Sequence, residues 1–211
     1  MMKFFVLSSV VLCLVILTGD VCGDDVKVAV TEVAKPDVSK EVDEVVVKER
    51  VATLLAIMPD LLEMMGVPRE IKLSDGHPVM VRARATATAL ARMENDASWR
   101  AIAFVYAGAE GGFHASPPGF NDAGAACGPH QVHVAEAKAI LEPGMTCEAI
   151  RKDLSMGLRA GLLVMKSLTK DCGSMAGALT AYGTNGQCPK NWTLPAVIKR
   201  MKIAKLHKAA P

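Results

Sequence analysis

The chain has 211 residues, of which 51% are hydrophobic and 22% charged, and its formal net charge at pH 7 is +2. This length accommodates one compact domain together with processing and linker segments. A net charge this small does not by itself indicate nucleic-acid binding, and we expect no nucleic-acid partner.

Residues 1–23 are typical of a secretory signal peptide. Lys3 gives a positive start, and an apolar run over residues 4–17 precedes the small residue Gly23. The run is shorter than the roughly 20 residues that span a bilayer. Cleavage after Gly23 would export the protein to the periplasm or the cell exterior and would leave the net charge at +2. An uncleaved membrane anchor is the alternative interpretation.

The cysteines that would remain after cleavage indicate disulfide bonds. An even number of cysteines in an exported chain suggests two bonds, and four cysteines permit three pairings that sequence does not distinguish. Cys127–Cys147 with Cys172–Cys188 is the favoured pairing because each bond closes a short loop. A zinc site is the rival, but the spacings contain no Cys-x-x-Cys pair.

The region before residue 96 reads as a linker followed by helices. Residues 24–45 are rich in charges and β-branched side chains and predict a flexible linker. Apolar residues then recur at helical spacing over residues 46–65 and again over residues 79–93. We therefore divide the mature chain into the linker, an N-terminal helical segment over residues 46–95, and a domain over residues 96–211.

The remaining chain predicts further helices and no convincing strand. Asn95 or Asp96 is a candidate N-cap for a helix over residues 97–109, which Gly111 and Gly112 would end. A loop rich in Gly, Pro, Ala and Asn follows. Helical patterns resume over residues 132–141, 147–168, 174–182 and, with a basic composition, 194–208. The predicted fold class is mostly α.

Glu110 is the strongest candidate for a catalytic residue. Trp99, Ala103, Tyr106 and Glu110 recur every three or four residues, so they share one helix face. Apolar and aromatic surroundings favour the protonated form of a carboxyl, which suits it to donate a proton. Glycoside cleavage needs such a donor, because the leaving sugar oxygen must be protonated. A helix-terminal Glu that merely faces water is the alternative.

Four segments, in order across residues 97–190, resemble soluble lytic transglycosylases. Their Glu-Ser-Gly-Phe motif is matched by Ala109-Glu110-Gly111-Gly112-Phe113. Their Gly-Ala-x-Gly-Leu-Met-Gln-x-Met-Pro segment is similar to Gly124-Ala125-Ala126-Cys127-Gly128-Pro129-His130-Gln131-Val132-His133, which has one extra residue. Their Ala-Tyr-Asn-Ala-Gly segment resembles residues 181–186, and the helix before it resembles residues 158–163. The match covers a little under half the chain.

The resemblance implies a lysozyme-like helical domain with a substrate cleft that cleaves peptidoglycan. Glu110 would be the single acid and then the base, closing a 1,6-anhydro ring on the muramoyl sugar. Gln131 would contact polar groups of the sugar, and Tyr182 would orient Glu110 or the sugar ring. A core aromatic whose hydroxyl bonds to the backbone is the structural alternative for Tyr182.

The sequence departs from the family at several groove positions. Gly111 replaces the family's Ser, and Gly183 replaces its Asn. The family's Leu-Met becomes Pro129-His130, which makes His130 a predicted groove residue. These departures leave the acid in place but put substrate preference in doubt.

Asp122 bears on which reaction is catalysed. It follows Glu110 by twelve residues, in the loop where goose-type lysozymes, which share the fold, carry an assisting Asp. Hydrolysis usually employs a second carboxylate, whereas intramolecular ring closure does not need one. Asn121-Asp122-Ala123-Gly124 is also an ordinary turn, and we favour that interpretation. A muramidase is therefore the first alternative function, with Asp122 as a candidate substrate-site residue.

The remaining predictions concern metals and partners. His130 and His133 have a spacing that could ligate zinc on one helix face, but there is no HExxH pattern, so we predict no metal and no cofactor. The predicted partner is the peptidoglycan glycan strand, with envelope-spanning or phage assembly as a possible setting, and the chain is predicted to be a monomer. A catalytically silent peptidoglycan-binding or assembly module is the second alternative.

Overall fold

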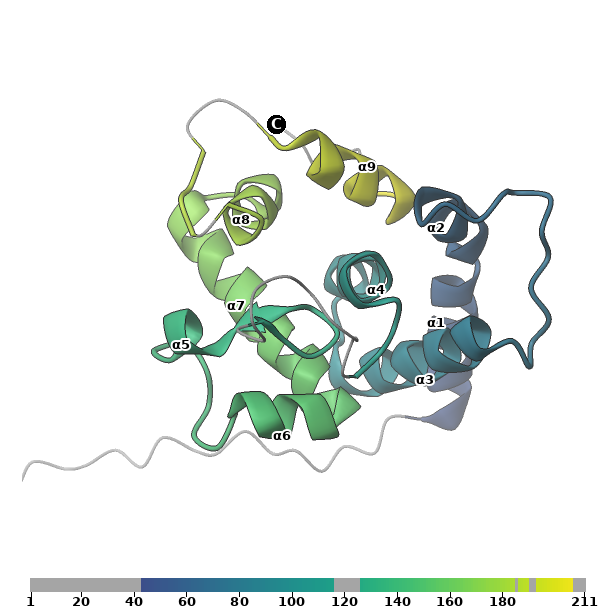
Figure 1. Ribbon diagram of the computed structural model, residues 1–211, viewed down its shortest axis with the longest axis horizontal. Coiled ribbons are helices and arrows are strands. Elements are labelled where there is room, and N and C mark those ends of the chain that lie inside the picture. Colours follow the sequence, from purple (N-terminus) through teal and green to yellow (C-terminus); the bar gives the residue numbers. More distant parts are fainter. Residues whose placement is uncertain (1–42, 116–125, 185, 190–192, 207–211) are drawn as a thin grey trace, which may run out of the picture. The chain divides into compact units, whose positions relative to one another are not determined.

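Helix is the dominant secondary structure of the computed structural model, which describes residues 43–115, 126–184, 186–189 and 193–206. The mostly-α prediction is confirmed. The predicted signal peptide, nearly all of the predicted linker, and Asp122 lie outside the described residues. Within the described ranges, no helix has both the length and the apolarity needed to cross a membrane. The helices in Figure 1 are α1 (Glu44–Leu55), α2 (Met58–Met64), α3 (Pro78–Met93), α4 (Ala97–Gly111), α5 (Val134–Ala137), α6 (Cys147–Lys152), α7 (Leu154–Cys172), α8 (Met175–Tyr182) and α9 (Pro195–Ile203).

Pro59 divides the predicted helix over residues 46–65 into α1 and α2. Proline has no backbone N–H, and inside a helix its ring clashes with the carbonyl four residues earlier, here that of Leu55. In the first turn of a helix the missing N–H costs nothing, and Pro59 lies in the first turn of α2. The chain therefore ends α1 at Leu55 and starts a new helix.

Asp153 divides the predicted helix over residues 147–168 into α6 and α7. Its backbone is extended, with φ −120° and ψ 112°, so α6 ends there. Its carboxylate accepts a hydrogen bond of 3.0 Å from the Met156 N–H and caps α7. α7 then continues to Cys172, where Gly173, with a φ of 72°, ends it.

A short hairpin replaces the start of the predicted helix over residues 132–141. β1 (Ala126–Cys127) pairs antiparallel with β2 (Val132–His133), and Cys127 lies opposite Val132. Gly128 and Gln131 at the ends of the connecting turn have φ values of 72° and 55°. This left-handed backbone reverses the chain instead of continuing a helix. The expectation of no strand was therefore wrong here, and α5 is a single short turn.

The main hydrophobic core surrounds α4, which Figure 1 shows end-on between α1 and α3 on one side and α7 on the other. α4 contacts α1, α2, α3, α7 and α9. Every residue from Ile102 to Ala107 is at most 1% exposed. Leu54, Leu61 and Leu90 from the first three helices belong to this same core. Residues on both sides of the predicted boundary near residue 95 therefore pack in the same hydrophobic core.

A second, smaller hydrophobic cluster lies around the hairpin and α6. It contains Cys127, Val132 and Ile150. The Cys127–Cys147 disulfide joins the hairpin to the start of α6, with 5.4 Å between the Cα atoms. A second disulfide, Cys172–Cys188, joins the end of α7 to the segment after α8. The favoured pairing of the four cysteines is therefore confirmed, and both bonds are consistent with an oxidising compartment.

Candidate functional site

Glu110 lies in the last turn of α4, at the edge of the core. Asp96 caps the start of the helix by accepting hydrogen bonds from the Ser98 and Trp99 N–H groups, at 2.8 and 2.9 Å. Gly112 ends the helix in a left-handed conformation, with a φ of 55°. The buried middle of α4 holds its end in place, so the partly exposed Glu110 is carried on a rigid element.

Glu110 opens onto a cavity of about 460 Å³, which we call the Glu110 cavity. Gln131 and Tyr182 line the same cavity, although they come from the turn after β1 and from the end of α8. The three residues singled out by the sequence thus meet at one place. The rest of the wall is formed by His130, Val132, His133, Glu136, Ala137, Ile140, Val164, Leu168, Gly183 and Gly186.

Gln131 adopts an unusual backbone conformation in this wall. A φ of 55° is uncommon for a residue other than glycine and persists only where its surroundings enforce it. The Gln131 backbone N–H donates to the Gly128 carbonyl at 3.1 Å, and its side-chain Nε2 donates to the same oxygen at 2.8 Å. The amide nitrogen is thus engaged by its own turn, and the amide oxygen has no partner among the described residues.

The turn that carries Gln131 packs against two glycines of α7. A Cβ atom added to Gly157 would lie 2.6 Å from the Pro129 Cδ atom, and one added to Gly161 would overlap the His130 ring. Glycines four residues apart lie on the same helix face, so together they form a groove for the turn. Sequence reasoning missed this feature, although the Gly157-x-x-x-Gly161 spacing was a signal that could have found it.

The His130 imidazole belongs to the packing beneath the cavity. The residue is 0% exposed, and its Nε2 lies 2.8 Å from the Ala103 carbonyl oxygen of α4. Burial lowers the pKa of His130 to about 4, although the Ala103 carbonyl acts in the opposite direction. The ring ties the turn to α4, while the residue also lines the Glu110 cavity, so contact between His130 and substrate stays a prediction.

Tyr182 also ties the turn in place. Its hydroxyl donates a hydrogen bond of 2.7 Å to the His130 carbonyl oxygen, which is the structural alternative considered for this residue. Its ring meets the Tyr106 ring edge-on, with 6.0 Å between the centroids. Burial, and secondarily the nearby Glu110 carboxylate, raise the pKa of the Tyr182 hydroxyl well above its usual value. The hydroxyl is therefore neutral, and Tyr182 forms part of the cavity wall.

Arg200 of α9 is a neighbour of Glu110 that sequence reasoning did not find. Its Nη1 lies 2.5 Å from the Glu110 Oε1, and the side chains are 17% and 31% exposed, respectively. Its guanidinium carbon is 4.4 Å from the centre of the Tyr106 ring. The only signal in the sequence was the basic composition of the last segment, residues 194–208, which does not select one residue among five Lys and Arg.

A zinc site on His130 and His133 was only the rival interpretation, and the part of the chain that the structure describes holds no cluster of the usual metal ligands. No group of three or more His, Cys, Asp or Glu side chains there could hold a metal ion. His133 lies 3.8 Å from Glu136, measured between Nδ1 and Oε1.

Comparisons of the chain with protein-family models, curated proteins and solved structures found no match. The sequence motifs and the residues that line the cavities therefore carry the indication of function.

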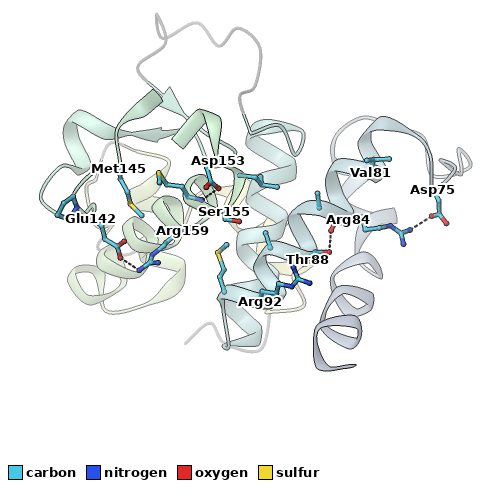
Figure 2. A pocket seen from close by; sticks show the side chains of 16 residues that line it. Asp75, Val81, Arg84, Thr88, Arg92, Glu142, Met145, Asp153, Ser155 and Arg159 are labelled. Atoms are coloured by element: carbon cyan, nitrogen blue, oxygen red, sulfur yellow. Dashed lines mark hydrogen bonds and ion pairs between the residues drawn. The ribbon is translucent and has the colours of Figure 1, made fainter. Parts of the chain in front are cut away.

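A larger cavity, of about 1010 Å³, lies between α3 and α7 and is shown in Figure 2. Its charged rim is compensated by ion pairs. Arg84 pairs with Asp75 at 3.0 Å, and Arg159 pairs with Glu142 at 2.6 Å, as the dashed lines mark. The Asp153 carboxylate caps α7. The Glu110 cavity is the better candidate for chemistry, because Glu110, Gln131 and Tyr182, which the sequence singled out, line it together.

Proposed function

We propose that the protein is a peptidoglycan lytic transglycosylase with a lysozyme-like helical domain and that the Glu110 cavity binds its glycan. The bond cleaved is the β-1,4 linkage between N-acetylmuramic acid and N-acetylglucosamine. The observation that carries the proposal is that Glu110, Gln131 and Tyr182, from three separate segments, line one cavity. Those are the residues to which the sequence resemblance assigns acid, sugar-contacting and orienting roles.

One carboxyl group is sufficient for the proposed reaction. Glu110 donates its proton to the glycosidic oxygen, the bond from that oxygen to the muramoyl C1 breaks, and the glucosamine sugar leaves with a new hydroxyl. The C6 hydroxyl of the same muramoyl sugar then bonds to C1 and gives its proton to the Glu110 carboxylate. The acid is regenerated, a 1,6-anhydro ring forms, and no water is consumed.

The other two residues shape the site. Among the described residues only the amide nitrogen of Gln131 is engaged, so the amide oxygen can accept a hydrogen bond from a sugar hydroxyl or amide. Tyr182 keeps its proton and its bond to the His130 carbonyl, so it supplies no acid. Glu110 is therefore the proton carrier of the site.

Substitution of Glu110 by Gln tests the proposal. Removing a general acid–base group costs about 100-fold or more in rate, so Glu110→Gln is expected to abolish most release of soluble fragments from purified peptidoglycan. Glu70→Gln is the matched control, because it makes the same chemical change at an exposed residue that does not line the cavity. Full activity of Glu110→Gln would contradict the role given to Glu110.

A peptidoglycan-binding module is the second candidate, and one observation favours it. The Glu110 carboxylate is already paired with Arg200, so it could serve the fold rather than the chemistry. Sedimentation with insoluble peptidoglycan distinguishes the two functions. If the wild-type protein sediments with the polymer and releases no fragments, the binding module is correct and the enzyme is not.

A further inference from the structure

Arg200 differs from the other basic residues of α9. Lys199 and Lys202, one and two positions away, are exposed to solvent. The Arg200 side chain is 17% exposed and is directed against the end of α4. α9 packs on both α4 and α8, and Val197 and Met201 anchor it in the core. Arg200 therefore projects from a helix whose position is fixed.

Its guanidinium is held by two different contacts. One nitrogen pairs with the Glu110 Oε1 at 2.5 Å, and the guanidinium carbon lies 4.4 Å from the centre of the Tyr106 ring. A cation over an aromatic face is attracted by the negative face of the ring, and partial desolvation strengthens the attraction. Tyr106 is 1% exposed and belongs to the main hydrophobic core, so its ring is packed on all sides. The cation consequently has one preferred place.

These contacts leave the two oxygens of Glu110 in different surroundings. Oε1 is held by Arg200, whereas no ion pair or hydrogen bond within the described residues engages Oε2. Glu110 also lines the cavity that Gln131 and Tyr182 share. A carboxyl anchored through one oxygen can rotate little, so the remaining oxygen is presented to a ligand in a defined orientation.

We propose that Arg200 is a positioning residue for Glu110, an inference that rests on the proposed transglycosylase function. By holding Oε1, Arg200 fixes the orientation in which Oε2 meets the glycosidic oxygen. Arg200 touches neither sugar in this arrangement and acts through Glu110 alone.

Arginine suits this position better than lysine. Its planar guanidinium can lie over the Tyr106 ring while one edge pairs with Glu110, whereas an ammonium group is a compact point charge without a plane. Lysine would keep the charge and lose the fixed geometry. Arg200→Lys should therefore retain part of the activity, and Arg200→Gln should retain least.

Steady-state kinetics on a soluble peptidoglycan fragment test the proposal. We expect Arg200→Gln to lower kcat about 10- to 100-fold, the scale on which a misplaced catalytic group reduces rate, with KM changed less than about threefold. Arg200→Lys should fall between this variant and the wild type. Lys199→Gln is the matched control, because it removes one positive charge from the same helix, and it should have the wild-type kcat.

Two further measurements separate positioning from folding. Thermal unfolding of each variant detects a general loss of structure. In Arg200→Ala, millimolar guanidinium chloride, well below denaturing concentrations, should restore several-fold activity, whereas it should not affect Lys199→Ala. Rescue by the free cation is expected of a lost charge beside Glu110 and not of a misfolded chain.

The activities of the variants distinguish a failure of the positioning role of Arg200 from a failure of the proposed transglycosylase function. If Glu110→Gln is inactive while Arg200→Gln and Arg200→Lys keep the wild-type kcat, Arg200 has no positioning role and the transglycosylase proposal stands. A folded Arg200→Gln variant whose loss is entirely in KM would also overturn the inference. If the wild-type protein cleaves nothing, the proposed function fails and the inference fails with it.

Discussion

His130 shows how one buried side chain makes the site depend on pH. Its ring is enclosed between α4 and α7, and its Nε2 is bonded to the Ala103 carbonyl. Burial lowers its pKa from 6.5 to about 4 in the folded protein. Between those values the unfolded chain binds a proton that the folded chain does not, so acid favours unfolding.

The stability that neutral His130 provides should be complete above pH 6.5 and be lost as the pH falls toward 4. One pKa unit corresponds to about 1.4 kcal/mol, so the loss in the free energy of unfolding should be roughly 3 kcal/mol. Denaturant unfolding of the wild type and of His130→Gln, measured from pH 7 to pH 4, checks this. If the difference between the two proteins does not change over that range, the burial argument is wrong. His133→Gln, at an exposed position, is the control.

The sequence predicts the position of a site residue only where neighbouring residues mark the ends of its helix. Asp96 is followed by an apolar helical pattern and Gly111-Gly112 ends it, so the helix that carries Glu110 was predicted nearly to its ends. Arg200 was not predicted, because its pairing with Glu110 joins residues 90 positions apart through the packing of α9 on α4. Nothing in its immediate sequence distinguishes it from Lys199 or Lys202.

At the scale of elements, the contact between α7 and the turn before β2 sets the position of Gln131. Gly161→Ala would place a methyl group inside the His130 ring and so displace the turn. Overpacking of this kind costs about 1 to 3 kcal/mol of unfolding free energy, occasionally more. Activity on peptidoglycan should fall together with stability, because Gln131 moves with the turn.

Gly76→Ala is the control for this prediction. A Cβ atom there meets nothing within 4 Å, so the change should alter the unfolding free energy by less than about 1 kcal/mol. Denaturant unfolding of both variants gives the comparison. Equal stability of Gly161→Ala and Gly76→Ala would show that the α7 groove does not hold the turn.

Two breaks between helices mark the limit of periodicity as a predictor. Apolar spacing continued through Pro59 and through Asp153, and so predicted single helices where the structure has two. Pro59 by itself is sufficient to predict the first break. Asp153 is not a sufficient signal for the second break. An Asp on an exposed helix face and an Asp that caps a new helix have the same sequence pattern until the packing of α6 against α7 is known.

At the scale of the whole molecule, the disulfides secure the two ends of the site. Cys127–Cys147 encloses the turn that carries His130 and Gln131, and Cys172–Cys188 spans the Tyr182 segment. The bonded cysteines are 20 and 16 residues apart in the sequence, and closing loops of this length corresponds to roughly 3 kcal/mol in the chain-entropy account. The favoured pairing was correct because sequence neighbours in a compact chain are also spatial neighbours.

Replacing Cys127 and Cys147 by Ser should lower the unfolding free energy by roughly 3 kcal/mol and reduce activity on peptidoglycan. The same double replacement at Cys172 and Cys188 should lower stability similarly, because the two loops have similar lengths. Denaturant unfolding in the absence of reductant measures both effects. Wild-type stability of the Cys127/Cys147 variant would contradict the idea that this bond secures the turn.

Cleavage of glycan strands by Glu110 without water is tested most directly by the chemistry of the new chain ends. Mass spectrometry of peptidoglycan digested by the wild-type protein should find 1,6-anhydromuramoyl ends, which are lighter than hydrolysed ends by one water molecule. Glu110→Gln should release almost none. Hydrolysed reducing ends in the wild-type digest would contradict cleavage without water and identify a muramidase.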